Sequence, residues 1–134
     1  MRPAQQILEG EVYLHQFKVN AKEAHDGEIW HWHQDYRTWY EDDGMPQPDV
    51  INATVFLDEV NEFNGPMMFI PGSHKNGRID SDNDFERVPE YGRLSADAVG
   101  SPYKQETINS QIAKHGIIAP KGPAGSTIFF HGCT

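Results

Sequence analysis

Hydrophobic and polar positions alternate along two stretches of the chain, and a period of two residues predicts β-strands. In residues 11–20, one face carries Tyr13, His15, Phe17 and Val19, and the other carries Val12, Leu14, Gln16, Lys18 and Asn20. The second face starts apolar and ends polar. This indicates either a strand that runs from the core to a binding cavity or a strand whose polar side meets water. In residues 50–60, the two faces carry Ile51, Ala53, Val55 and Leu57, and Asn52, Thr54 and Phe56.

Shorter apolar runs, bounded by turn residues, predict the remaining elements. We expect an aromatic strand over residues 29–36 and short strands over residues 67–70, 116–119 and 126–130. Short helices are expected over residues 4–8, 96–99 and 106–115, and turn-rich loops over residues 21–27, 39–48, 61–66 and 120–125. Because the strands are separated by turns and not by regular crossover helices, the pattern predicts one mostly-β domain over residues 1–134, either a sandwich or a jelly roll.

Residues 75–110 form a long polar insertion with almost no hydrophobic period. A long irregular segment in a compact domain is usually a lid, a binding loop or a disordered segment. We therefore expect a lid over residues 75–110 that is the least ordered part of the chain, with a solvated excursion of no function as the alternative.

Composition excludes several functions. Acidic residues outnumber basic ones by 20 to 11, which gives a formal charge of −9. This charge does not favour binding to the phosphate backbone of nucleic acid. No apolar run is long enough for a membrane span, and the N-terminus lacks a signal-peptide pattern. The single cysteine, Cys133, cannot form an internal disulfide, which is consistent with a reducing cytoplasm.

The candidate chemistry lies in Trp32-His33-Gln34-Asp35. On a strand, His33 and Asp35 would point to the same face and present an imidazole nitrogen beside a carboxylate oxygen. One such pair, with a second histidine from a distant strand, makes the facial triad that holds non-haem Fe(II). The alternative is that the two residues are ordinary polar groups on the wet face of an edge strand.

Three motifs in this order resemble the phytanoyl-CoA dioxygenase family, and within it the ectoine-hydroxylase-like branch. They are Trp32-His33-Gln34-Asp35 with Trp39, Asp43-Gly44-Met45-Pro46, and the run from Asn64-Gly65-Pro66 to Pro71-Gly72-Ser73-His74-Lys75. The resemblance implies a double-stranded β-helix, a cupin-like jelly roll, that is incomplete at its C-terminus here. It also implies an Fe(II)- and 2-oxoglutarate-dependent hydroxylase whose partners are O2 and a small molecule.

The resemblance assigns roles to individual residues. His33 and Asp35 match two iron ligands, and the carboxylate of Asp35 favours hydroxylation over halogenation. Gln16, Asn20 and Trp39 match positions that contact 2-oxoglutarate, and Trp39 also lines the substrate pocket. His74 is expected to be structural.

Two departures from the family pattern concern the substrate. Lys18 stands in place of a substrate-binding arginine, and lysine cannot form the bidentate contact of a guanidinium. Asn52 stands in place of a small hydroxyl residue, and we assign both to the substrate. Ectoine is therefore doubtful as the substrate, and a small, polar, amino-acid-like molecule is expected.

The resemblance also implies that one ligand is missing from the chain. In the family pattern the second iron-binding histidine would fall two positions beyond Thr134, after Phe129-Phe130-His131-Gly132. His131 lies an odd number of positions from the expected ligand, so on a regular strand it would face the other way. We expect weak iron binding, no turnover of 2-oxoglutarate, and exposed strand edges that favour self-association. The alternatives are a non-catalytic jelly-roll binding module and a cupin-like site for another metal such as Zn(II).

Overall fold

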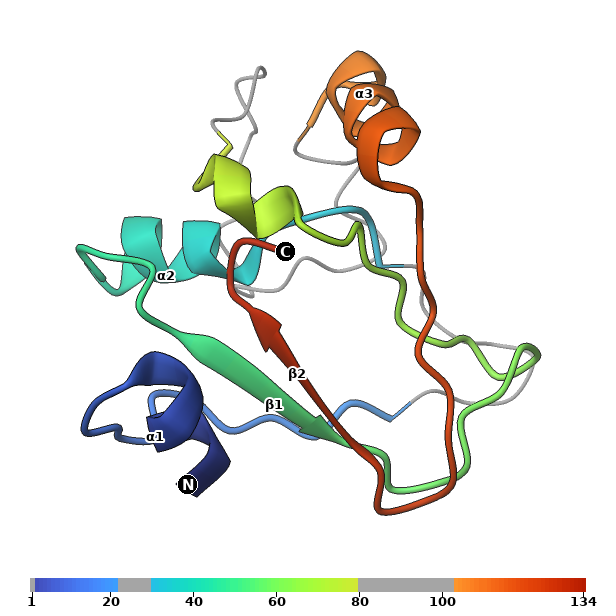
Figure 1. Cartoon of the computed structure of the whole chain (residues 1–134), viewed down its shortest axis with the longest axis horizontal. Coiled ribbons are helices and arrows are strands. Elements are labelled where there is room, and N and C mark those ends of the chain that lie inside the picture. The colour runs from blue at the N-terminus through green and yellow to red at the C-terminus, as the bar shows by residue number, and fades with distance from the viewer. Residues whose placement is uncertain (1, 22–29, 80–102) are drawn as a thin grey trace.

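The computed structural model describes residues 2–21, 30–79 and 103–134 (Figure 1). The helices are α1 (Arg2–Leu8), α2 (Asp35–Asp42) and α3 (Gln105–His115), with one 3-10 turn, η1 (Ser73–Asn76); the strands are β1 (Ile51–Val55) and β2 (Thr127–His131). Within these ranges no helix is both long and apolar enough to cross a membrane. The predicted helices over 4–8 and 106–115 and the strands around residues 50–60 and 126–130 are thus confirmed.

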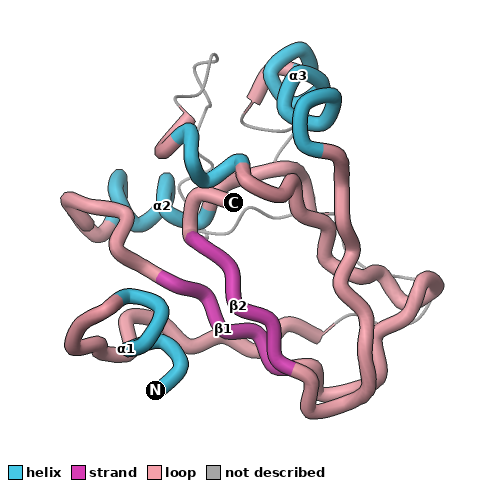
Figure 2. Tube along the Cα trace, in the orientation of Figure 1, coloured by secondary structure: helices cyan, strands magenta, loops and turns pink. Residues whose placement is uncertain are grey.

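β1 and β2 pair in antiparallel fashion, with Ile51 opposite His131 and Val55 opposite Thr127. Beyond the ladder the two segments stay side by side, as isolated bridges join Val60 to Gly122 and Phe69 to Ile118. Figure 2 shows these two long arms running along each other, mostly as loop. The strands predicted over 67–70 and 116–119 are therefore single bridges, and the sheet formed by the described residues has two strands.

The sheet has an inner and an outer face. Asn52 lies opposite Phe130 and Thr54 opposite Ile128, so these four side chains share the partly buried face. The ring of Phe69 packs on Phe130 there, with centroids 4.7 Å apart. On the other face Val55 and Phe129 are exposed. The polar residue Asn52 therefore points inward, where its amide needs a partner.

The predicted aromatic strand over residues 29–36 is wrong, because helix α2 begins inside it at Asp35 and runs on into the predicted loop over 39–48. Tyr36 and Trp39 are three positions apart and both buried, which is the spacing of one helix face. On the other side, Arg37 pairs with Glu41 at 3.0 Å in the i, i+4 geometry of a helix. Asp35 occupies the first turn, where a carboxylate interacts favourably with the helix dipole.

The core lies where α2 meets the end of β2. Tyr36, Trp39 and Cys133 form its buried cluster, and Met45 and Val50 pack against them. The backbone N–H of Tyr36 donates to the carbonyl oxygen of Gly132 at 2.9 Å, which satisfies an N–H that the helix itself cannot. This contact places the first turn of α2 directly against the chain that leaves β2.

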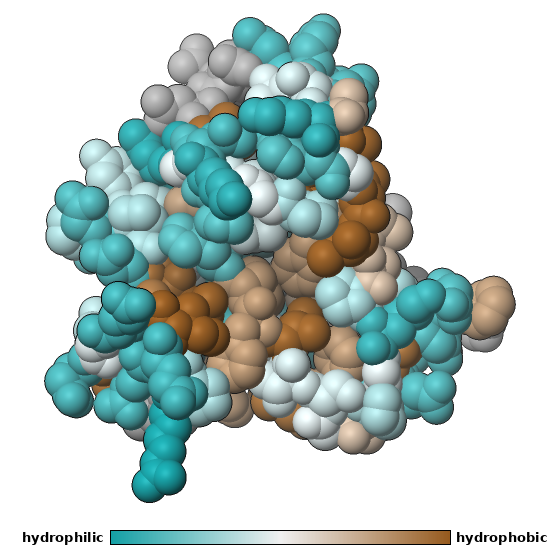
Figure 3. Space-filling model, viewed as in Figure 1, coloured by the Kyte–Doolittle hydropathy of each residue, from teal (hydrophilic) through white to brown (hydrophobic). Residues whose placement is uncertain are grey.

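The strand predicted over residues 11–20 is also wrong, because this segment has no regular structure and pairs with no strand in the described ranges. Its apolar residues Tyr13, Leu14, Phe17 and Val19 are exposed. Apolar surface also gathers over the β1–β2 region in the centre of one face, with polar surface around it (Figure 3). The predicted helix over 96–99, and most of the loop over 21–27 and of the insertion over 75–110, lie outside the described residues.

Candidate metal centre

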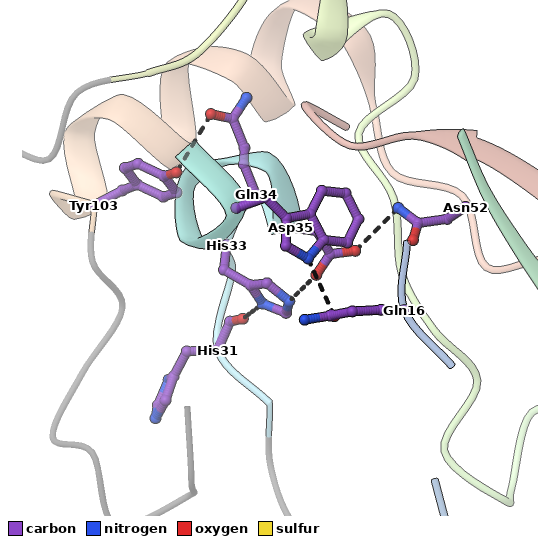
Figure 4. Close-up of polar contacts among 8 residues, drawn as sticks. Gln16, His31, His33, Gln34, Asp35, Asn52 and Tyr103 are labelled. Carbon is purple, nitrogen blue, oxygen red and sulfur yellow. Dashed lines mark hydrogen bonds and ion pairs between the residues drawn. The ribbon is translucent and has the colours of Figure 1, made fainter. Parts of the chain in front are cut away.

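His33 and Asp35 do come together, but not on a strand. His33 lies in the irregular segment before α2, and Asp35 is the first residue of the helix. The imidazole Nε2 of His33 is 3.3 Å from the carboxylate Oδ1 of Asp35 (Figure 4). The prediction that the two side chains share one strand face is therefore wrong, while the juxtaposition arises from the turn into the helix.

The second ring nitrogen of His33 fixes the orientation of the imidazole. Nδ1 lies 2.7 Å from the carbonyl oxygen of His31, which can only accept, so Nδ1 carries the proton and donates it. Nε2 is then the nitrogen directed at Asp35. Burial lowers the pKa of His33, but the hydrogen bond and the charge of Asp35, with the His31 carbonyl, raise it above its ordinary value.

Asp35 has a different partner on each oxygen. Oδ1 faces His33, while Oδ2 accepts a hydrogen bond of 3.1 Å from the side-chain amide of Asn52 on β1. Figure 4 shows His33 and Asn52 approaching the carboxylate from different sides. Asn52, which the sequence assigns to the substrate, thus donates to a candidate metal ligand in this structure.

Gln34, between the two candidate ligands, is a buried residue that sequence reasoning did not single out. Its Nε2 donates to the carbonyl oxygens of Gly77 and Cys133, at 3.1 and 2.6 Å. Its Oε1 accepts from the backbone N–H of Ile79 at 2.8 Å and from the hydroxyl of Tyr103 at 3.3 Å. An amide side chain has two donor hydrogens and two acceptor lone pairs, so Gln34 uses all four. The backbone that carries His33 and Asp35 is thereby tied to three other segments.

Gln16 and Trp39, two of the predicted co-substrate contacts, are joined directly. The indole N–H of Trp39 donates to Gln16 Oε1 at 3.1 Å, and His15 beside it pairs with Asp43 at 2.8 Å. These contacts dock residues 15 and 16 against α2 although the segment forms no strand. Gln16 thus reaches the neighbourhood of the candidate pair, as Figure 4 shows.

The remaining two predicted contacts are less well placed. Asn20 is exposed and makes no hydrogen bond to another described residue. Lys18 is also exposed, but its ammonium lies close enough for its charge to lower the pKa of His33 slightly against the larger effects that raise it.

His131 does not join the pair. It lies opposite Ile51 on β2, one position away from Phe130, which faces Asn52. Its Nδ1 accepts the backbone N–H of Cys133 at 3.0 Å, and its ring packs on His74 with centroids 5.5 Å apart. No set of three His, Cys, Asp or Glu side chains that could hold a metal ion occurs in the part of the chain that the structure describes. The described residues therefore bring together two candidate ligands, His33 and Asp35.

Comparison with known proteins matches the chain to one family and to individual relatives. The family model for phytanoyl-CoA dioxygenase matches residues 1–134. An L-proline trans-4-hydroxylase from Streptomyces griseoviridis is 38% identical over 130 residues, covering 96% of this chain and 48% of that protein. An ectoine dioxygenase from Halomonas elongata is 36% identical over 135 residues, covering 97% of this chain and 39% of that protein.

Solved structures agree with this. The crystal structure of EctD from S. alaskensis with 2-oxoglutarate and 5-hydroxyectoine superposes with a TM-score of 0.74 at 32% identity, covering 97% of this chain and 39% of the other. The structure of EctD with bound Fe gives a TM-score of 0.72 at 35% identity, with the same coverage. The chain thus shares its fold with the matching part of EctD and spans less than half of the length of these relatives.

Proposed function

Because the chain belongs to the phytanoyl-CoA dioxygenase family, we propose that it is part of an Fe(II)- and 2-oxoglutarate-dependent dioxygenase in which His33 and Asp35 bind the iron. The observation that carries the proposal is the convergence of His33 Nε2 and Asp35 Oδ1 at 3.3 Å. Two ligands that lie about 2.1 Å from one ion and at a right angle to each other are about 3.0 Å apart. The pair therefore needs only a small adjustment to hold one ion.

The surroundings of the pair fit a metal ion in a second respect. Metal-binding histidines usually donate their other ring N–H to a carbonyl or a carboxylate, which fixes the tautomer. The His31 carbonyl has this role for His33. A divalent cation bound between Nε2 and Oδ1 would compensate the negative charge of Asp35, and its binding excludes a proton from Nε2.

Bound iron would supply the redox chemistry that couples the oxidative decarboxylation of 2-oxoglutarate to hydroxylation of the substrate. The chain's own residues would orient the reactants and shield them. Trp39 holds Gln16 through its Oε1, and the amide N–H groups of Gln16 have no partner among the described residues, so they would donate to 2-oxoglutarate. Asn20 is a weaker candidate for the same task because, unlike Gln16, it has no hydrogen bond that holds it to another described residue.

We further propose that the substrate is small, polar and amino-acid-like. Two relatives are named for the small molecules L-proline and ectoine, and neither molecule carries a long apolar chain. Lys18 provides a positive charge near His33 that suits a carboxylate on the substrate. The arms that contain β1 and β2 would belong to a double-stranded β-helix, as the fold shared with EctD supports.

Metal binding by the chain tests the assignment. The wild-type chain and the variants His33→Ala and Asp35→Ala are titrated with Fe(II) under argon, and binding is measured by calorimetry. We expect weak binding by the wild type, since two protein ligands are available, and none that is specific in either variant. Asp43→Ala, which removes a carboxylate paired with His15 and not with His33, is the matched control. Equal binding by all four proteins would exclude His33 and Asp35 as ligands.

Turnover distinguishes an oxygenase from a binding module. We expect the 134 residues alone to release no succinate from 2-oxoglutarate, and the whole natural protein to release it only with Fe(II). If the whole protein binds iron but releases no succinate with any small amino acid, the non-catalytic module is the better description. A preference for Zn(II) over Fe(II) in metal analysis of untagged protein would favour a cupin-like site for another metal.

A further inference from the structure

Among the described residues, the side chain of Asn52 is the hydrogen-bond donor to Asp35 Oδ2, and it comes from a different element of the fold. Asn52 is the second residue of β1, and Asp35 opens α2. The bond of 3.1 Å therefore connects the sheet to the first turn of the helix.

The position of Asn52 is fixed by the strand ladder. Its backbone lies opposite Phe130, and Phe130 is packed by Phe69 on the same inner face. A shift of one residue in the register would turn Asn52 to the exposed face. The amide is thus presented to Asp35 by a rigid element and not by a loop.

An asparagine amide suits this task for an electrostatic reason. Its N–H groups donate to a carboxylate without neutralising it, so Asp35 keeps the full negative charge that attracts a cation. A lysine or arginine there would compete with the cation. Because the amide occupies Oδ2, Oδ1 is the oxygen left to face His33 Nε2.

We propose that Asn52 is a positioning residue that holds Asp35 through Oδ2, so that the carboxylate offers Oδ1 alone to the metal ion. The inference rests on the function proposed above. It reassigns Asn52 from the substrate to the support of a metal ligand, and it implies that Asp35 occupies only one coordination position.

Two measurements on the 134-residue chain test the role. In the first, without metal, the side-chain amide resonances of Asn52 are followed by NMR. We expect them to move when Asp35 is replaced by Ala and to stay in place in Thr54→Ala, which alters the next residue on the same face of β1. Asn52 resonances that do not respond to Asp35→Ala would overturn the proposal.

In the second measurement the chain is titrated with Mn(II), and the paramagnetic broadening of the His33 and Asp35 resonances gives the affinity. Loss of an outer-shell partner typically weakens metal binding 10- to 100-fold, so we expect Asn52→Ala to need about ten times more Mn(II). Thr54→Ala should match the wild type. Asn52→Val, which lacks the donor but favours the strand, should match Asn52→Ala if the hydrogen bond and not the fold is the cause.

The outcomes separate the two proposals. If the wild type shows broadening that His33→Ala abolishes, and Asn52→Ala matches the wild type, the metal site stands and the role of Asn52 is refuted. If the wild type shows no broadening that depends on His33, the metal site itself is wrong and the role of Asn52 is lost with it.

Discussion

Gln34 and Cys133 are joined by a hydrogen bond of 2.6 Å from the side-chain amide to the backbone carbonyl, although 99 positions separate them in the chain. Together with the bond of 2.9 Å from Tyr36 N–H to the Gly132 carbonyl, it ties the segment that enters α2 to the segment that leaves β2. The Cys133 side chain is fully buried and packs with Tyr36 and Trp39 in the core. The candidate metal pair sits on the α2 side of this junction.

Replacing Gln34 by Ala should destabilise the chain strongly. The change leaves the carbonyls of Gly77 and Cys133 and the N–H of Ile79 without their partner, and each buried polar group without a partner costs about 1–3 kcal/mol. We expect a loss of about 3 kcal/mol in the free energy of unfolding, measured by urea denaturation. Gln105→Ala, at an exposed glutamine, should change it by less than about 0.5 kcal/mol. Similar losses in both variants would contradict the role of Gln34.

Replacing Gly132 by Ala should also destabilise the chain, because the added methyl group has no space. A Cβ there would lie 2.9 Å from Val50 Cγ1, 3.1 Å from Trp39 Cζ3 and 3.2 Å from Tyr36 Cβ. Overpacking of this kind costs about 1–3 kcal/mol. Gly10→Ala, whose Cβ would meet only the Leu8 carbonyl at 3.7 Å, is the matched control and should be neutral or slightly stabilising. Thermal unfolding followed by circular dichroism measures both.

Acidification should destabilise the fold through His131. Burial and the charge of His74 lower the pKa of His131, outweighing Asp49 and the Pro48 backbone, which raise it. Protonation would also place a hydrogen on Nδ1, which now accepts the N–H of Cys133. The unfolded chain therefore binds this proton more readily. The stabilising effect of neutral His131 is complete above its unfolded pKa of about 6.5 and is lost as the pH falls through the lower folded value.

The variant His131→Asn isolates this effect, because an asparagine oxygen can take the place of Nδ1 as acceptor but does not titrate. We expect the free energy of unfolding of the wild type to fall more steeply than that of the variant between about pH 7 and pH 5. The difference in slope cannot exceed about 1.4 kcal/mol per pH unit for one proton. Parallel curves for the two proteins would show that another group causes the pH dependence.

Cys133 should report the opening of the junction. Burial raises the pKa of its thiol, against a smaller lowering by the charge of Arg78, so the folded chain presents little thiolate. Labelling with a thiol reagent then requires transient opening. Gln34→Ala should speed labelling about 100-fold, the factor that corresponds to about 3 kcal/mol. Labelling of the wild type at the rate of unfolded chain in urea would show that Cys133 is not protected.

The sequence predicts the elements whose signal is local. Helix α3 and strand β2 fall close to the expected bounds, whereas β1 covers only the first half of the strand expected over residues 50–60. The strand predicted over residues 29–36 is wrong because aromatic residues favour strands in general. The evidence for a helix lies further along the chain, in the spacing of Tyr36 and Trp39 and in the Arg37–Glu41 pair. The strand predicted over residues 11–20 is wrong because an alternation of apolar and polar residues does not by itself make a strand. The backbone also needs a neighbouring strand to pair with.

The candidate site is predicted in its residues more than in its geometry. The spacing of His33 and Asp35 brings the two side chains together on a strand or on a tight turn into a helix. The two side chains are therefore close together, although the predicted strand is absent. The bond from Asn52 to Asp35 depends on how β1 sits against α2, and that is a property of the tertiary fold. The four hydrogen bonds of the Gln34 side chain cannot be predicted from the sequence, because their partners are mostly backbone groups far away in the chain.

The junction between residues 34–36 and 132–133 has a consequence for biosynthesis. Contacts between such distant residues require the closure of a large loop before they yield any stabilisation, which makes them late events in folding. As the chain leaves the ribosome, residues 33–35 are made early but cannot be held in place until residue 133 has emerged. The nascent chain therefore lacks this support for the candidate pair while the 99 positions from Gln34 to Cys133 are made. If the pair binds iron as proposed, it can hold the ion in its final geometry only after β2 has docked.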